Sequence, residues 1–443
     1  MKKVLSTVAA LGLVAGLAST AAAVEFKMSG KYLVDGAYLS DARGNGLDVT
    51  EAAGESTPSD AYFLHTFEMK PTMKVNDKIS MGANIRLADD TFWGGQAGGD
   101  TDTTGRGIGE AAGDVEVWHL YMDYASPIGK MRFGRTPAGP YGTAFNDPDL
   151  RRDRVMLWPS FLASGPFSTL FYIQKNNDSF QTGTHVDETD TDSDTYTARF
   201  YYKTDSMDTG LNYSFMNNMT SDLLSDRKYD LTVYGKFKMD NFFLNGELTH
   251  FFGEKDWDAA ATLDRDYDSW AGMLQVGGKF DALTPSLMYF YASGQDINAT
   301  AANGGDIENA LSTGTGDLFE PLYILTGRHT GMLNNDLFNN YTGTMSTAGV
   351  HAVVAAVDYA VSNQLSLHGA IGWAQADEEQ AVGQDDEYGW EYNVGAAYKL
   401  LDNLTYEAHF GYLDTGDFFN GAGNTPDITE NVYVLTHSLT MTF

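Results

Sequence analysis

The sequence predicts an all-β fold, in which one antiparallel sheet closes into a transmembrane β-barrel of about 18 strands. Large, mostly apolar side chains alternate with small or polar ones from Glu25 to Phe443, which is the pattern of half-buried strands. Short turns alternate with long polar stretches, as expected for a barrel that has one turn end and one loop end. After the amino terminus, no apolar run is long enough to cross a bilayer as a helix.

Residues 1–23 have the features of a secretory signal peptide. Lys2 and Lys3 precede an apolar stretch, and a run of small residues matches the A-x-A cleavage pattern. Charge returns at Glu25, so the apolar stretch is too short for a membrane anchor. We expect cleavage after Ala23, which leaves residues 24–443 as a single barrel domain.

Composition excludes several classes of site and partner. The chain has no cysteine, so disulfides, thiolate metal sites and covalently attached haem are excluded, and no cofactor is expected. A formal net charge of -32 makes nucleic acid an improbable partner. The mean hydropathy of -0.29 argues against a helical membrane protein.

The strands can be placed one after another from the alternation. In "VEFKMSGKYLVDGAY" an apolar face with aromatic ends alternates with a charged face, and "YTARFYYK" repeats this pattern. Sixteen strands remain an alternative, because "RRDRVMLWPS" and "PFSTLFYIQK" carry the weakest pattern. The 18 strands are expected near residues 25, 62, 78, 115, 129, 153, 167, 195, 208, 229, 241, 267, 283, 350, 364, 387, 403 and 431.

The lengths of the connections divide the barrel into two ends. Short turns are expected near Asn76, Pro127, Asp205, Asp240, Asn363 and Asp402, and long loops at residues 39–61, 89–113, 176–192, 295–348 and 414–430. Short periplasmic turns and long extracellular loops are typical of outer-membrane β-barrels.

The last residues, "NVYVLTHSLTMTF", predict the closing strand. No backbone group can stay unpaired in a bilayer, so the final strand must pair with the first. Phe443 would then sit in the aromatic girdle at the membrane interface and act as the C-terminal assembly signal. His437 falls on the lipid side of this strand, where a subunit contact is the simplest explanation.

The stretch "GKMRFGRTPAGPYGTAFNDPDLRRDR", together with the leader, the girdle aromatics and Phe443, resembles the Gram-negative outer-membrane homotrimeric porin family. The resemblance implies a homotrimer in the cell outer membrane that lets small hydrophilic solutes and ions diffuse passively. It also implies contact with outer-membrane lipid, lipopolysaccharide and the barrel assembly machinery. The third extracellular loop, counted as residues 138–152, would fold inward as a constriction.

The candidate pore constriction consists of Asp147 and Asp149 in that loop, followed by Arg151, Arg152 and Arg154. Opposite charges across a narrow waterway would create a transverse field that orients dipolar solutes. The alternative is an ordinary surface loop with local ion pairs.

The charged face of the first strands supplies a candidate pore wall, formed by Lys31, Arg86, Arg132, Arg199 and Lys203. The acidic residues lie more often in loops, so the net charge of the chain need not be that of the pore. We expect a vestibule that favours cations, and a waist that prefers anions remains the alternative.

Two loops raise further questions. The acidic residues of 187–194 could hold Ca²⁺ or Mg²⁺, but the glycine and closing glutamate of an EF-hand are absent, so a solvated loop is expected. Segment 295–348 is too apolar for a freely solvated loop; packing against its neighbours is favoured over a lid.

Other classes of function find less support in the residues. A solute-specific channel is the main alternative to a diffusion channel. An enzyme is not expected, because no G-x-S-x-G or H-E-x-x-H motif accompanies the scattered histidines. A receptor for energised uptake is disfavoured, because the first strand begins near Glu25 and leaves no room for a plug domain.

Overall fold

A computed structural model describes the barrel and part of its loops. The described residues are 24–40, 59–93, 115–137, 139, 141–145, 152–177, 192–221, 224–257, 263–300, 302–310, 319–327, 348–379, 383–420 and 431–443. They form one antiparallel sheet of 18 strands, which confirms the predicted fold class and the larger of the two predicted strand numbers. The expected signal peptide, residues 1–23, lies outside the described residues.

The strands follow the predicted positions closely. In chain order they are β1 (Glu25–Leu39), β2 (Asp60–Lys74), β3 (Ile79–Phe92), β4 (Glu116–Ser126), β5 (Gly129–Thr136), β6 (Arg152–Pro159), β7 (Phe167–Asn177), β8 (Ser193–Lys203), β9 (Met207–Ser221), β10 (Leu224–Met239), β11 (Phe242–Trp257), β12 (Arg265–Gly278), β13 (Leu283–Ala292), β14 (Val350–Ala360), β15 (Leu365–Gln375), β16 (Glu387–Leu401), β17 (Leu404–Thr415) and β18 (Val432–Thr442). Two short 3-10 turns, η1 (Ser160–Leu162) and η4 (Asp417–Asn420), complete the described elements.

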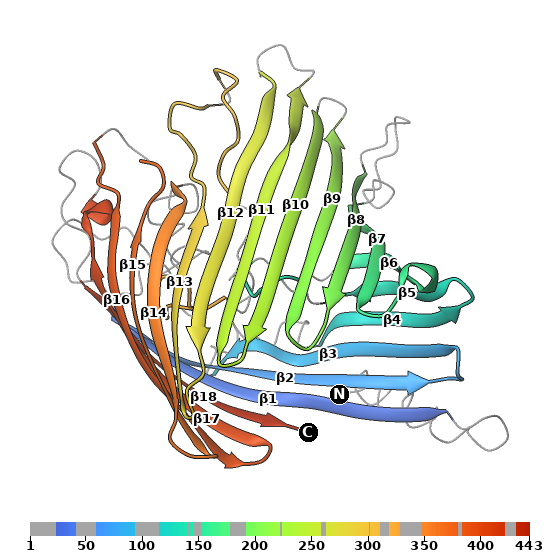
Figure 1. Ribbon diagram of the computed structural model, residues 1–443, viewed down its shortest axis with the longest axis horizontal. Coiled ribbons are helices and arrows are strands. Elements are labelled where there is room, and N and C mark those ends of the chain that lie inside the picture. Colours follow the sequence, from blue (N-terminus) through green and yellow to red (C-terminus); the bar gives the residue numbers. More distant parts are fainter. Residues whose placement is uncertain are drawn as a thin grey trace, which may run out of the picture.

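The sheet closes on itself. Each strand pairs with its neighbours in the chain, so the strands follow one another around the barrel in Figure 1. β18 pairs with β1 from Lys31↔Thr442 to Leu39↔Val434. Phe443 continues this ladder, because its backbone exchanges two hydrogen bonds with Gly30, of 2.9 and 3.1 Å. Closure leaves no open sheet edge, which a bilayer would not tolerate.

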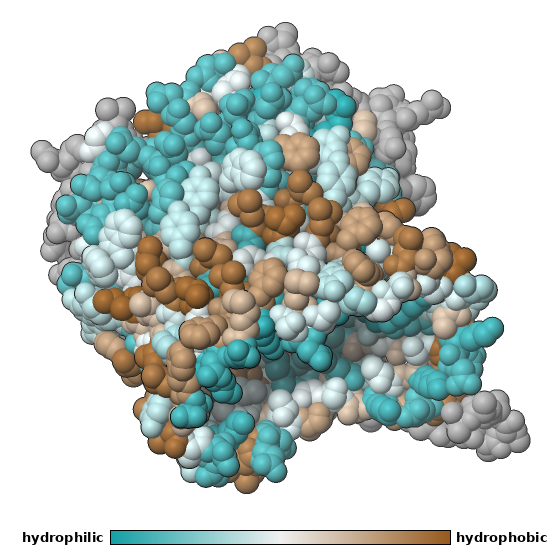
Figure 2. All heavy atoms as spheres, in the orientation of Figure 1, coloured by the Kyte–Doolittle hydropathy of each residue, from teal (hydrophilic) through white to brown (hydrophobic). Residues whose placement is uncertain are grey.

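The alternation separates an outer face from an inner face. On β10, Thr232 is buried inside the barrel, whereas its neighbours Leu231 and Val233 are 38% and 43% exposed on the outside. Figure 2 shows the result as a belt of hydrophobic residues across the wall, bordered by hydrophilic zones. The belt matches the apolar band that faces lipid in membrane barrels.

The connections have the predicted asymmetry. Residues 127–128, 240–241 and 402–403 are two-residue turns at one end, whereas residues 293–349 join β13 to β14 at the other. None of the helices among the described residues is long and apolar enough to span a membrane.

The interior is not an open tube. A buried apolar cluster lies inside the barrel, where Phe290, Val350 and Ala352 of the inner wall meet Leu322 and Ile324 of the long β13–β14 connection. These five side chains are at most 2% exposed. The described residues 319–327 of this connection therefore pack inside the barrel, against one side of the inner wall.

Candidate functional site

The described residues of the connection between β5 and β6, which are 137, 139 and 141–145, enter the barrel. The Tyr141 hydroxyl donates to the backbone oxygen of Thr232 on β10 at 3.0 Å. The backbone N–H of Thr143 donates to the carboxylate of Glu247 on β11. Phe145 is 2% exposed. The described part of this third loop therefore lies along the inner wall, in the place that the resemblance implied.

A second inward segment, residues 319–327, comes from the β13–β14 connection. The carboxylate of Glu391 on β16 accepts the backbone N–H groups of Ile324 and Leu325, both at 2.8 Å. The ring of Phe319 meets Phe145 of the third loop edge to face, with the centroids 5.0 Å apart. The two loops thus join inside the lumen.

Together the two segments form a shelf on one side of the barrel, defined here as residues 139, 141–145 and 319–327. Among the residues that the structure describes, the hydrogen bonds and ring contacts of the shelf reach from Arg199 on β8 to His409 on β17. In the described part of the chain, the shelf therefore lies against β8 to β17, and the inner face of β18 and β1 to β7 forms the rest of the wall.

That inner face is rich in cations. Among the residues whose side chains the structure describes, the register places nine basic side chains on it, against six carboxylates: Lys27, Lys31, Lys70, Lys74, Arg86, Lys130, Arg132, Arg152 and Arg154, with Glu25, Asp35, Glu68, Asp89, Glu116 and Asp123. The described side chains of this part of the wall therefore carry an excess of positive charge.

Arg132 on β5 shows how these cations are held. Its guanidinium donates to both oxygens of Asp123 on β4, at 2.6 and 2.9 Å. It also lies over the ring of Tyr121, 3.8 Å from the centroid. A paired fork on an aromatic face is a rigid arrangement, so the charge has a fixed position on the wall.

Arg86 on β3 is held in the same way. Its guanidinium lies 3.0 Å from the ring centroid of Trp118, and its Nε is 3.4 Å from the carboxylate of Glu68. It also forms an ion pair with Asp89. The side chain is only 13% exposed, so its aromatic and acidic neighbours shield most of it from water.

Arg154 and Arg199 lie deeper in the structure. Arg154 lies on β6 and donates to Gln174 at 2.8 Å and to the backbone oxygen of Thr136. Arg199 donates to Asn212 at 2.9 Å and to the backbone oxygen of Gly139 at 3.1 Å. Arg199 therefore holds the third loop through the backbone of Gly139.

The other predicted site residues are spread along the barrel. Arg152 is the first residue of β6. Lys31 is half-buried on β1, where it faces Glu68 across the ladder. Lys203 ends β8, 72% exposed, and pairs with Asp208 at 2.8 Å. Asp147, Asp149 and Arg151 lie outside the described residues.

The acidic loop 187–194 lies mostly outside the described residues. Asp192 and Asp194, which are described, both accept from Lys175, at 3.3 and 3.1 Å. In the described part of the chain, no group of histidine and acidic side chains could hold a metal ion.

Sequence reasoning missed Glu247 and Glu391, the two buried carboxylates that hold the shelf. They are 5% and 0% exposed. Their position on the inner face follows from the alternation, but other inward acids share that signal. Only the contact with a distant loop distinguishes them.

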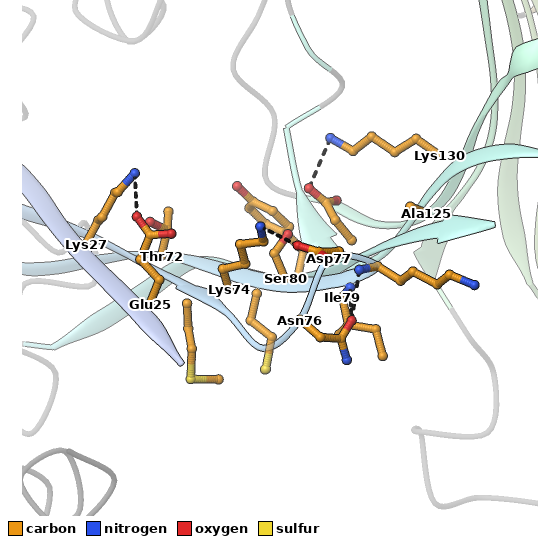
Figure 3. Close-up of a pocket in the computed structure, with 15 residues that line it drawn as sticks. Glu25, Lys27, Thr72, Lys74, Asn76, Asp77, Ile79, Ser80, Ala125 and Lys130 are labelled. Atoms are coloured by element: carbon orange, nitrogen blue, oxygen red, sulfur yellow. Dashed lines mark hydrogen bonds and ion pairs between the residues drawn. The ribbon is translucent and has the colours of Figure 1, made fainter. Parts of the chain in front are cut away.

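A pocket of about 440 Å³ opens at the turn between β2 and β3 (Figure 3). Lys27, Lys74, Lys78 and Lys130 line it together with Glu25, Asp77 and Asp123. Each of these three acids pairs with a lysine, and Figure 3 labels the pairs Glu25–Lys27 and Asp77–Lys74; the Lys74–Asp77 pair measures 2.8 Å. A hydrogen bond and the charge of Lys74 lower the pKa of Asp77. Basic side chains thus continue to the periplasmic mouth.

At the opposite, extracellular end, a group of acidic side chains lies together. Glu378 follows β15 and lies near Asp377, Asp296 and Glu308; burial first, then these carboxylates, raise its pKa. The acids at this mouth and the basic wall below it place opposite charge at successive depths of the channel.

Comparison with known proteins agrees with this geometry. The model of a family described as "Porin subfamily" matches residues 167–439, more than half of the chain. The search of curated proteins found no match.

Solved structures share the fold at low identity. OccK8 (OprE) of Pseudomonas aeruginosa has a TM-score of 0.54 and 11% identity, over 95% of this chain and 98% of that chain. OccK9 (OpdG) of the same species has a TM-score of 0.54 and 13% identity, over 95% and 99%. OpdQ gives 0.53 and 12%, over 95% and 97%. With its closed barrel, inward loops and matching family model, the chain belongs to the Porin subfamily and is a channel for small solutes in the Gram-negative outer membrane.

Proposed function

We propose that this channel lets small hydrophilic solutes and ions diffuse passively between the shelf and the basic wall, and that it prefers anions at its narrowest part. The observation that carries the proposal is the one-sided filling of the lumen. The shelf covers the side that carries Glu247 and Glu391, so solutes pass the side that carries Arg86 and Arg132. The acidic outer mouth explains why the net charge of the chain is a poor guide to selectivity.

The third loop has its own part in this proposal. Asp147, Asp149, Arg151, Arg152 and Arg154 would form the constriction, and Lys31, Arg86, Arg132, Arg199 and Lys203 the wall. The support is the inward course of Tyr141 to Phe145, which brings the loop into the lumen.

Reconstitution in a planar bilayer tests the function. We expect stepwise conductance that rises with bulk salt, and a reversal potential of anionic sign at about 0.1 M salt, where wall charges are least screened. Absence of conductance would contradict the channel. Block of the current by one solute at saturating concentration would instead favour the solute-specific alternative. We also expect no hydrolysis of lipid or peptide substrates.

We further propose that the chain assembles as a homotrimer through the outer face of β5 and β6. These two strands have only eight residues each, whereas a strand that crosses a bilayer needs about 9–11. Arg135 and Asp153 form a 3.6 Å ion pair on this outer face. Charge on a short stretch of wall is unfavourable against lipid and acceptable against another subunit.

The assembly can be tested by measuring the mass of the detergent-solubilised protein. We expect three copies, and we expect Asp153→Arg to reduce that number by placing like charge beside Arg135. Asp268→Arg is a matched control, because Asp268 on β12 is also 62% exposed. A monomeric wild type, or equal loss in the control, would overturn the interface.

Targeting and assembly complete the proposal. Residues 1–23 would direct export, and Phe443 would be read by the barrel assembly machinery before the barrel meets lipid and lipopolysaccharide. Phe443 is 49% exposed and stacks on Phe67 at 6.1 Å, as a girdle aromatic should.

A further inference from the structure

The inner wall of β15, β16 and β17 contains a seat for the shelf segment 319–327. The seat consists of Gly372, Gly395 and Gly411. A Cβ atom at Gly372 would lie 2.7 Å from Leu322, and one at Gly395 would lie 2.9 Å from the Tyr323 hydroxyl. Side chains at Gly372 or Gly395 would displace the segment, so the wall is shaped to receive it.

Glu391 lies in the middle of this seat. It pairs with Gly372 across the β15–β16 ladder, and it is fully buried. Each carboxylate oxygen accepts one backbone N–H, from Ile324 and from Leu325, at 2.8 Å. Burial removes water from a carboxyl group, so its oxygens need protein donors such as these.

The segment is prepared for this contact. The Thr326 hydroxyl and the backbone of Leu322 exchange hydrogen bonds of 2.8 and 3.0 Å, which close a turn that points two N–H groups the same way. Tyr323 reaches across β16 and forms a 2.9 Å hydrogen bond with His409 on β17. The turn presents donors, and the wall presents the acceptor.

We propose that Glu391 is the positioning residue that sets the width of the passage. By holding residues 322–326 in the glycine seat, it fixes the shelf that narrows the lumen. The inference rests on the proposed diffusion function and adds the residue that fixes the size limit. Without the carboxylate, the two backbone N–H groups lose their acceptor in a buried place, and the segment leaves the seat to reach water.

The test uses Glu391→Ala and Glu391→Gln in bilayer recordings at 1 M KCl and in uptake of polyethylene glycols of graded size. We expect Glu391→Ala to raise single-channel conductance at least twofold and to admit larger polymers. Glu391→Gln keeps one acceptor oxygen, so its conductance and its size limit should lie between those of Glu391→Ala and of the wild type. If Glu391→Ala does not insert into the membrane, Glu391→Gln still tests the proposal. Wild-type conductance and a wild-type size limit in Glu391→Gln would overturn it.

A charge-matched control separates positioning from electrostatics. Glu407 is a carboxylate on the inner face of β17, two residues from His409. Glu407→Gln should leave conductance and size limit unchanged, since it removes the same charge without emptying the seat. An equal increase in this variant would show that charge alone causes the effect.

A reversible crosslink provides the rescue. A Cβ atom at Gly411 would lie 3.2 Å from the Cβ of Tyr323, close to the 3.5–4.5 Å usual for disulfides, and the chain has no other cysteine. Adding Tyr323→Cys and Gly411→Cys to Glu391→Ala should restore wild-type conductance when oxidised and lose it when reduced. Identical currents in both states would overturn the proposal, whereas a silent wild type would contradict the channel function itself.

Discussion

Arg132→Gln tests whether solutes pass along the basic wall. The substitution removes one charge that two hydrogen bonds to Asp123 and the ring of Tyr121 hold in place. Lys130, 3.0 Å from Asp123, remains to balance that carboxylate, so we expect the barrel to keep its fold. The lost charge should make the wall less favourable to anions and more favourable to cations.

The size of the effect follows from Coulomb's law. At about 7 Å in water, the Coulomb interaction between a monovalent ion and the guanidinium is about 0.6 kcal/mol, attractive for an anion and repulsive for a cation. The substitution removes this interaction. Screening at about 0.1 M salt reduces this to about 0.3 kcal/mol, and at about 1 M to less than 0.1 kcal/mol. Because anions and cations shift in opposite directions, the anion-to-cation permeability ratio should fall about threefold at about 0.1 M and about 1.2-fold at about 1 M.

The assay is the reversal potential of each variant under a salt gradient at both ionic strengths. Lys175→Gln is the control, because it removes the same charge from the outer face of β7, where Lys175 pairs with Asp194 at 3.0 Å. We expect no measurable shift in this control. An equal shift in the control, or an unchanged ratio in Arg132→Gln, would refute a passage along the wall.

Three further predictions concern the loop and the two ends of the chain. Replacing Asp147 and Asp149 with Asn should reduce cation permeability, and replacing Arg151 and Arg152 with Gln should increase it; the reversal potential measures both changes. The control replaces the outer-loop residues Asp190 and Asp192 with Asn. An equal shift in that control would contradict an inward constriction. The mass of the mature protein should match a chain that starts at Val24, whereas retention of residues 1–23 would contradict cleavage. Phe443→Asp places charge at the interface beside Phe67 and should slow insertion, as measured by the heat-modifiable folded fraction; a wild-type fraction would contradict its girdle position.

The local pattern was sufficient to predict the barrel. A period of two depends only on neighbouring residues, so "YTARFYYK" identifies both faces of β8 without knowledge of its partners. Barrel closure followed from a general requirement, because a bilayer leaves no backbone group unpaired, and Phe443 indeed pairs with Gly30.

Only the tertiary structure shows which side chains hold the segments that lie inside the lumen. Arg199 was correctly assigned to the charged face of its strand, yet nothing in its neighbours indicates that its guanidinium supports Gly139. Glu391 has the same local pattern as Glu407. It differs because closure of the barrel brings a turn 66 residues earlier in the chain against it, with glycines on three strands leaving room. Alternation determines on which side of the wall a residue lies, whereas only contacts between distant segments determine what it holds.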